Sequence, residues 1–348
     1  MIESKKPILA ITMGDAAGIG PEIAVKSFNE KSLYDKCCPL LMGNSSIIKK
    51  QIELLGFSLV VNSIQVVDDA QFTYGVIDVY EHIVEGGVED IKFGEISSKS
   101  GDLAFRCIVS AIELALSKKV DGTVTGPIHK AAINAAGHHF SGHTEIYAHY
   151  TNTSKYGMLL ADDQLKVIHV STHVSLREAI DLTKKSRIIE VTKLLYDSLT
   201  QMGYDNPKIG IAGLNPHAGD NGLFGREEIE EISPAVASLQ KDGIDVEGPI
   251  PPDTLFALAN GGKYDGCVAM YHDQGHIPFK VVGFQWDKKK GTMKSVKGVN
   301  ITLGLPIIRT SVDHGTAFEV AGKGIASADA LSIAIDYALR LSKYKNSK

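Results

Sequence analysis

Short apolar runs of strand length alternate with segments of helical periodicity along most of this sequence. Ile8–Thr12, Pro39–Gly43 and Val76–Tyr80 are strand-like, whereas Ser45–Leu55 and Ser100–Lys118 carry apolar residues at helical spacing. Strands separated by helices of this size favour a mainly parallel sheet, because parallel neighbours need a long crossover connection. The chain is therefore expected to fold as an α/β protein.

Composition excludes several classes of protein. The 348 residues provide for about two domains, and 44% of them are hydrophobic. A net charge of -5 gives no basic footprint for nucleic acid, and no apolar run reaches membrane-spanning length. The first residues enter a strand-like run without a secretory signal. The four cysteines form no C-x-x-C pair, so a cytoplasmic location is the simplest, and any metal site would use histidine and carboxylate.

Three apolar runs each end in polar turn residues that include one histidine. His173 follows Lys166–Val170, His217 follows a run that ends at Leu214, and His272 follows Cys267–Tyr271. Open α/β proteins place ligands beyond the carboxyl ends of their strands. Three such histidines can converge on one metal, from one sheet edge or across subunits, with water or substrate in the remaining positions. The alternative is an ordinary polar loop after each strand.

Other residues are candidates for binding an anion. Lys280 follows His272 in the same stretch, and Arg309 is embedded among apolar residues where its charge needs a partner. A substrate carboxylate or phosphate would suit the arginine fork. His143 and Thr144 offer two hydrogen-bond donors to an anion, or Thr144 caps a helix that starts at Glu145.

Three further segments leave alternatives open. The loop Gly14–Gly20 leads into a helix near Pro21 and is either a phosphate cradle or a tight turn. Asp253 is either a helix cap or a carboxylate near the metal. Phe284–Gly298, with a run of three lysines, is predicted to be an exposed loop. An amphipathic helix is expected to close the chain near Arg340.

Several motifs resemble those of known dehydrogenases. The His314–Ala317 loop, with Ala321–Ala326, resembles the cofactor loop of isocitrate and isopropylmalate dehydrogenases. Nearly the whole chain is similar to the 4-hydroxythreonine-4-phosphate dehydrogenase family of vitamin B6 biosynthesis. The motifs that carry this second resemblance are Gly14–Glu22, Gly126–Lys130, Gly142–Glu145, Leu214–Gly219, Tyr271–Gly275 and Arg309–Ala317.

The resemblance implies an architecture and two bound groups. The fold would be two α/β/α domains with a central cleft, as in isocitrate and isopropylmalate dehydrogenases. Residues 1–130 plus 303–348 would form a cofactor-side domain, and 131–302 a domain for metal, substrate and dimerisation. The ligands of the family's divalent metal (Zn, Mg, Co or Mn) correspond to His173, His217 and His272. His272 would come from the partner subunit of a homodimer. NAD, or alternatively NADP, would bind at His314, Gly315, Thr316 and Ala317.

The resemblance also implies a reaction. The substrate contacts fall on His143, Thr144, Lys280, Asn300 and Arg309, and Asp253, Asp273 and Lys280 are the candidate catalytic residues. A second branch of the family, which acts on D-threonate or D-erythronate 4-phosphate, resembles this chain in His138–His143 and Gly275–Pro278. That branch implies oxidation of the 3-hydroxyl of a 4-phosphorylated four-carbon acid, followed by decarboxylation to a triose-phosphate ketone such as dihydroxyacetone phosphate.

Other functions compete with this prediction. One alternative is the 4-hydroxythreonine-4-phosphate dehydrogenase reaction of pyridoxal phosphate biosynthesis. Another class is a phosphotransacetylase-like acyl or phosphate transferase, which needs phosphate contacts but no nicotinamide. A metabolite-binding protein without catalysis is the third. The chain departs from the family pattern at Ala16, at Pro252 and in a lysine-rich insertion at 287–297; the insertion lies beside the predicted site and could alter the choice of substrate.

Overall fold

The computed structural model describes residues 6–288, 292–296 and 298–345. The chain divides into two compact units, Met1–Thr153 with Leu305–Lys343 and Ser154–Gly304 with Tyr344–Lys348. The first boundary lies at 153/154, whereas the boundary implied by the resemblance was 130/131. The residues between the two boundaries include the helices α5 (Lys130–Ala135) and α6 (His143–Tyr150). Both pack against α4 (Ser98–Leu116) of unit 1 and therefore belong to that unit.

Unit 1 contains an all-parallel sheet with the strand order β3-β4-β2-β1-β5-β14. Its central strands are buried on both sides, which explains their near-continuous apolar sequences. The strands are β1 (Ile8–Thr12), β2 (Cys38–Gly43), β3 (Val60–Ile64), β4 (Val76–Glu81), β5 (Gly122–Thr125) and β14 (Arg309–Val312).

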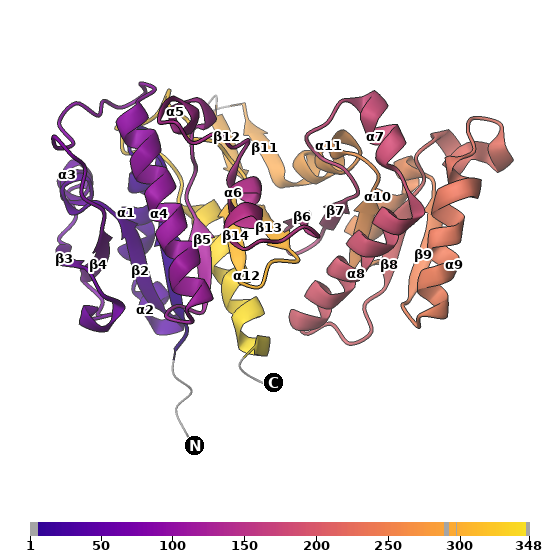
Figure 1. Cartoon of the computed structure of the whole chain (residues 1–348), viewed down its shortest axis with the longest axis horizontal. Coiled ribbons are helices and arrows are strands. Elements are labelled where there is room, and N and C mark those ends of the chain that lie inside the picture. Colours follow the sequence, from indigo (N-terminus) through magenta and orange to yellow (C-terminus); the bar gives the residue numbers. More distant parts are fainter. Residues whose placement is uncertain (1–5, 289–291, 297, 346–348) are drawn as a thin grey trace, which may run out of the picture. The chain divides into compact units, whose positions relative to one another are not determined.

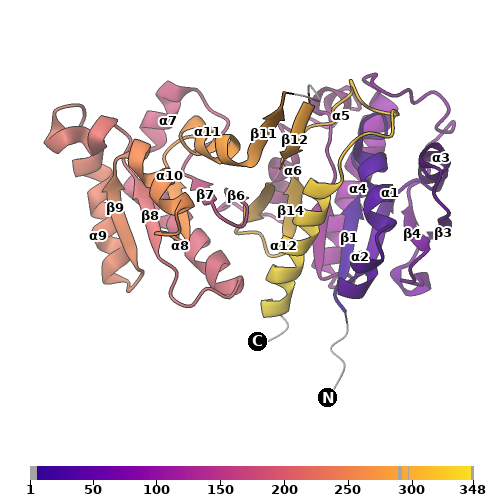
Figure 2. The ribbon, with the colours of Figure 1, turned by 180° about the vertical axis from the view of Figure 1, so that it is seen from behind.

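Helices cover both faces of this sheet. In Figure 1, α4 (Ser98–Leu116) lies in front of β1 and β2, with which it is in contact. From behind, α1 (Gly20–Phe28) and α12 (Asp329–Lys345) are in front of the strands (Figure 2). The remaining helices of the unit are α2 (Lys31–Lys36), α3 (Ser45–Leu55) and a single 3-10 turn, η1 (Val67–Asp69). The strand and helix predictions for residues 8–55 and 76–118 are confirmed.

Unit 2 contains a mixed sheet with the strand order β13-β6-β7-β10-β8-β9. Strands β7, β10, β8 and β9 are parallel, whereas β6 runs antiparallel to both of its neighbours. The strands are β6 (Gly157–Ala161), β7 (Lys166–His169), β8 (Ile209–Ala212), β9 (Val246–Ile250), β10 (Gly266–Ala269) and β13 (Val299–Leu303).

The helices of unit 2 also lie on both faces of its sheet. α8 (Lys185–Gln201) is on the face seen in Figure 1, and α10 (Pro252–Asn260) is on the face seen in Figure 2. A core cluster joins the strands to α10 and α11 (His272–Gly283) through Val167, Leu255 and Phe279, each fully buried. The other helical elements are α7 (Leu176–Leu182), α9 (Ser233–Lys241), a 3-10 segment η2 (Pro216–Gly222) and a π turn η3 (Glu228–Ile232).

One local prediction was wrong, and two of the open alternatives are ruled out. Phe284–Gly298 is not a loop, because β11 (Phe284–Asp287) pairs antiparallel with β12 (Thr292–Val296); Lys289 and Lys290 of the predicted lysine run lie outside the described residues. Thr144 does not cap α6, since Gly142 occupies the cap position without a side-chain bond. Asp253 does not cap α10, which begins after Pro251, and lies in the first turn instead.

The glycine loop before α1 is packed against the protein's own backbone. A Cβ atom at Gly14, where φ is +73°, would lie 2.4 Å from the Pro127 carbonyl oxygen, and one at Gly18 would lie 2.8 Å from that of Thr316. Left-handed φ and close approach both require glycine. The tight-turn interpretation therefore accounts for this loop.

Within the described residues, no helix combines the length and apolar character needed to cross a membrane.

Candidate active site

Each predicted metal-binding histidine follows one of three neighbouring parallel strands. β10 pairs with β7 on one side and with β8 on the other. His173 follows β7, His272 follows β10 and His217 follows β8. Because the carboxyl ends of parallel strands meet at one edge of the sheet, the backbone delivers all three histidines to the same edge of unit 2.

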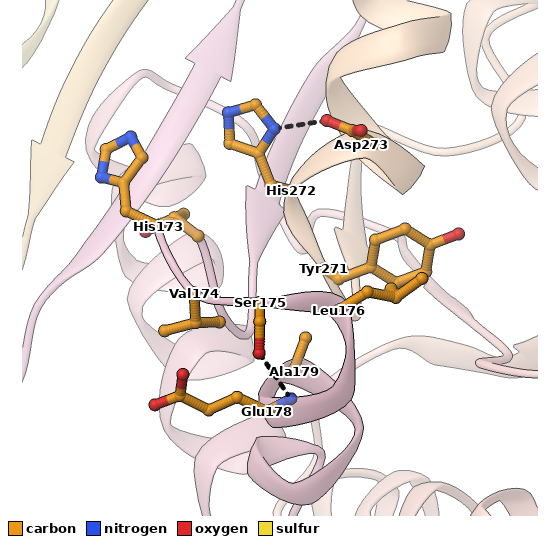
Figure 3. A pocket seen from close by; sticks show the side chains of 10 residues that line it. His173, Val174, Ser175, Leu176, Glu178, Ala179, Tyr271, His272 and Asp273 are labelled. Carbon is orange, nitrogen blue, oxygen red and sulfur yellow. Dashed lines mark hydrogen bonds and ion pairs between the residues drawn. The ribbon is translucent and has the colours of Figure 1, made fainter.

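His173 and His272 open into one pocket of about 560 Å³, shown in Figure 3. Their ring centroids are 5.9 Å apart, and Figure 3 shows both rings among the side chains that line the pocket. His272 is the first residue of α11, and Nδ1 of its ring donates to Oδ1 of Asp273 at 2.7 Å. Two neighbouring imidazoles at one pocket are ligands of the kind that a divalent cation such as zinc takes.

His217 does not join this pair within one chain. Among the residues that the structure describes, there is no group of three or more His, Cys, Asp or Glu side chains that could hold a metal ion. His217 begins a stretch of positive φ that runs through Gly222. The backbone just before it is held by Glu228, whose Oε1 accepts from the amides of Leu214 and Asn215 at 2.7 and 2.8 Å.

Two further histidine rings lie next to the ring of His272. The ring of His276 stacks on that of His272 with centroids 3.6 Å apart, and His169 lies 4.7 Å from His276. Burial lowers the pKa of His276 to about 4 and that of His169 to about 3, so both rings are neutral near pH 7. His169 lies in the core, because 1% of its surface is exposed.

Gly275 allows α11 to approach His169 closely. A Cβ atom there would lie 2.4 Å from His169 Nε2 and 2.8 Å from Val167 Cγ1. Alanine is the better helix former by about 1 kcal/mol, yet the overlap should reverse that gain. We expect Gly275→Ala to lower the free energy of unfolding by about 1–3 kcal/mol, measured by urea denaturation. Gly261→Ala is the control, because its Cβ would meet the nearest atoms at 3.4 Å; equal stability of both variants would contradict the packing argument.

Unit 1 contains a second polar cluster, at the start of α6. His143 and Tyr147 are four residues apart on this helix and therefore share one face. Arg309, at the start of β14, is 2% exposed; its guanidinium lies 5.6 Å from the Tyr147 ring centroid and donates to Thr125 Oγ1 at 2.9 Å. Burial and then the Arg309 charge hold the pKa of His143 well below its usual range. The cluster is thus a buried cation beside a neutral imidazole.

Neutral buried histidines make stability depend on pH. The folded-state pKa values of His143 and His169 are depressed, whereas an unfolded histidine titrates near about 6.5. Below about pH 6.5 the unfolded chain binds protons that the folded chain does not, so stability falls as pH falls, by about 1 kcal/mol per histidine between pH 6 and 5. Above that range this contribution is fully present.

Denaturation at pH 7, 6 and 5 tests this expectation. His143→Gln and His169→Gln should each have a shallower decline of unfolding free energy than the wild type, because each removes one of the groups that must become charged. An unchanged slope in both variants would show that these imidazoles do not carry the pH dependence.

The remaining predicted residues are distributed over both units. Lys280 lies on α11 at a spacing of four residues from His276, and Asn300 is on β13. Asp253 is an exposed residue of α10.

In the loop after β14, the Thr316 carbonyl accepts from the Ile19 amide at 3.0 Å, and His314 Nδ1 contacts the Gly315 carbonyl at 3.0 Å. Space is open beside Gly315, so this anchored loop fits close approach by a cofactor.

Sequence reasoning did not assign a role to His169, His276 or Tyr147. The signal for His276 and Tyr147 was their spacing of four residues from His272 and His143. The residues after Tyr271 were predicted as polar residues at the end of a strand, so no helix was expected to bring His276 next to His272. Nothing in the local sequence indicated that His169 would pack against that segment.

Fold and site together define an α/β protein with a histidine-lined pocket at the carboxyl edge of a parallel sheet. Residues 35–338 match the family of the pyridoxal phosphate biosynthetic protein PdxA. The D-threonate 4-phosphate dehydrogenase of Cupriavidus necator is 45% identical, covering 93% of this chain and 94% of its own length. That of Salmonella typhimurium is 44% identical, covering 96% and 98%. The chain therefore belongs to the PdxA family.

A solved structure agrees with this assignment. The crystal structure of 4-hydroxythreonine-4-phosphate dehydrogenase from Klebsiella pneumoniae is 42% identical in sequence and superposes with a TM-score of 0.84. It covers 97% of this chain and 100% of the crystallised one. The predictions of the family and of the α/β fold class are confirmed.

Proposed function

We propose that this protein is a metal-dependent NAD oxidoreductase of a 4-phosphorylated four-carbon acid, D-threonate or D-erythronate 4-phosphate. The observation that carries the proposal is the pair His173 and His272 at one pocket, in a chain 43–45% identical over nearly its full length to proteins named D-threonate 4-phosphate dehydrogenase. The reaction removes a hydride from C3, which NAD would accept when bound, and a proton from the 3-hydroxyl. The resulting 3-keto acid loses its carboxylate as carbon dioxide, and the carbon that carried it takes up a proton, which gives dihydroxyacetone phosphate.

The proposed roles divide between anchoring and chemistry. Lys280 and Arg309 supply positive charge to the phosphate and carboxylate, and His143, Thr144 and Asn300 supply hydrogen bonds. Because phosphate binding fixes the position of the reacting carbon, a dephosphorylated substrate should lose turnover as well as affinity. Asp253 and Asp273 are the candidates for removing the hydroxyl proton, and Lys280 is the candidate for protonating the carbon that loses carbon dioxide.

Two bound groups supply the chemistry that side chains lack. The residues proposed to hold a divalent metal are His173, His217 and His272, and those proposed to hold the nicotinamide cofactor are His314, Gly315, Thr316 and Ala317. When bound, the metal polarises the hydroxyl and the ketone and the nicotinamide accepts the hydride. The imidazole pair at the pocket and the anchored loop beside open space at Gly315 both fit these groups.

We further propose that the active enzyme is a homodimer. The third histidine is not brought to the pair within one chain, as far as the described residues go. Large apolar side chains on two helices of unit 2 are exposed, notably Leu176 on α7 at 61% and Ile277 and Val281 on α11 at 61% and 74%. Such exposure is typical of an interface between subunits. Sedimentation should give twice the chain mass of 37.4 kDa.

The four cysteines are thiols and not disulfides, which supports a cytoplasmic location.

One assay separates the candidate functions. Purified protein with NAD and a divalent metal is tested side by side on D-threonate 4-phosphate, D-erythronate 4-phosphate and 4-phosphohydroxythreonine, following reduced nicotinamide by absorbance. We expect the highest kcat/KM with one of the two phosphorylated sugar acids. Highest turnover of 4-phosphohydroxythreonine would favour the pyridoxal phosphate pathway reaction, which the Klebsiella pneumoniae relative supports. Acyl transfer from an acyl phosphate, with no reduction of NAD or NADP, would overturn the proposal.

A further inference from the structure

We infer that Asp273 and His276 are positioning residues that hold the His272 imidazole with its Nε2 atom directed to a divalent metal. This inference deepens the proposed function and rests on the metal-binding role of His272 within it. Both residues contact His272 directly, from the ring edge and from the ring face respectively.

Asp273 determines which ring nitrogen of His272 carries hydrogen. The distance from His272 Nδ1 to Asp273 Oδ1 is 2.7 Å, and Figure 3 shows the bond. A carboxylate can only accept, so Nδ1 must be the N–H donor, and the lone pair of the neutral ring is then on Nε2. A metal needs that lone pair, and histidine ligands usually donate their other ring N–H to a carboxylate or carbonyl. The Asp273 carboxylate therefore fixes the ligand atom of His272.

His276 determines the plane of the same ring. The two imidazoles are nearly parallel, with an interplanar angle of 10° and centroids 3.6 Å apart. His276 cannot turn easily, because it is 8% exposed and its Nδ1 donates to the His272 carbonyl at 3.0 Å. Rotation of the His272 ring away from this plane would break the stack.

His169 anchors the stack to the sheet. Its ring centroid lies 4.7 Å from that of His276 and 6.4 Å from that of His272, and its Nδ1 donates to the Met158 carbonyl at 3.3 Å. Strand β7, which carries His169, pairs directly with β10, which precedes His272. The orientation of His272 is thus set by the packed interior of unit 2 and not by a surface loop alone.

The inference changes the proposed division of labour between the two aspartates. A carboxylate that accepts the His272 N–H acts through that imidazole, so Asp273 serves as a positioning residue. Asp253 is then the aspartate that remains for removing the hydroxyl proton in the proposed reaction.

Two readouts on the full-length protein test the inference, and neither is turnover. The first is ¹⁵N NMR of histidine tautomers in metal-free protein, where His272 should carry hydrogen on Nδ1 in the wild type and become a mixture of tautomers in Asp273→Ala. The second is titration with Co²⁺, followed by its visible spectrum. We expect Asp273→Ala and His276→Leu to bind Co²⁺ roughly 10- to 100-fold more weakly than the wild type. His276→Phe keeps an aromatic ring over His272 and should stay close to wild-type affinity.

The controls separate failure of this inference from failure of the proposed function. Asp205→Ala removes an exposed carboxylate elsewhere in unit 2 and should bind Co²⁺ like the wild type. Wild-type Co²⁺ affinity in both Asp273→Ala and His276→Leu, or an Nε2–H tautomer of His272 in the wild type, would overturn the inference. Equal Co²⁺ binding by wild type and His272→Ala would instead overturn the metal-binding role of His272 in the proposed function, while the tautomer measurement would still report on Asp273.

Discussion

Mixing two inactive variants, His217→Ala and His272→Ala, should restore turnover to about a quarter of the wild-type value when their subunits are allowed to exchange. Each variant alone should lose about 4 kcal/mol of transition-state stabilisation, or roughly 10³-fold in kcat/KM, because each removes a proposed metal ligand. If His217 and His272 of one site come from different subunits, one of the two sites in a mixed dimer contains all three histidines intact. Random exchange makes half of the dimers mixed, and half of the sites in those dimers are intact.

A second mixture shows which histidine crosses the interface. The structure brings His173 and His272 of one chain within 5.9 Å, whereas the family resemblance assigns His272 to the partner. If His217 is the ligand supplied by the second subunit, a mixture of His173→Ala and His217→Ala recovers activity. If His272 is the ligand supplied by the second subunit, that mixture stays inactive, because each site then takes its His173 and His217 from one subunit and so contains one substituted histidine. No recovery in either mixture would mean that each site is built from a single chain.

The sheet and most of the helices could be predicted from periodicity. Apolar runs such as Ile8–Thr12 fit only strands buried on both faces, and the stripe on Ser100–Lys118 fits only a helix that packs on them. The order of the strands was not predicted, and the pairing of β10 with β7 and β8 comes from the structure. The sequence indicated that each of three histidines follows a strand, and it left one sheet edge and convergence across subunits both open.

Loop conformation is what the sequence pattern did not determine. A histidine four or five residues beyond a strand can point in several directions, and His217 lies in a left-handed stretch that only Gly219 and Gly222 hinted at. The start of α11 at His272 was hidden by Gly275, a poor helix former. Gly275 is required there by contact with His169, which is remote in sequence. The packing of His169 against the stacked rings of His272 and His276 therefore depends on tertiary contacts that override local propensity.

Replacing Arg309 by methionine should separate stability from function in unit 1. Arg309 is buried, and desolvation lowers the pKa of its guanidinium to about 10, so the charge persists at neutral pH at an energetic cost to the fold. Apolar replacements of buried charges are often neutral or stabilising. We expect Arg309→Met to keep or raise the melting temperature while kcat/KM falls on the order of 10²- to 10³-fold, through loss of about 3–4 kcal/mol of charge-assisted bonding to the phosphorylated substrate.

Two comparisons show whether the guanidinium acts through its charge or its shape. Arg309→Lys keeps the charge without the planar fork and should recover only part of the lost kcat/KM. Inorganic phosphate or the phosphorylated acid should raise the melting temperature of the wild type through binding to the folded state, but have little effect on Arg309→Met. If Arg309→Met is strongly destabilised yet still stabilised by phosphate as the wild type is, then Arg309 supports the fold around Thr125 and Tyr147 and does not bind the anion.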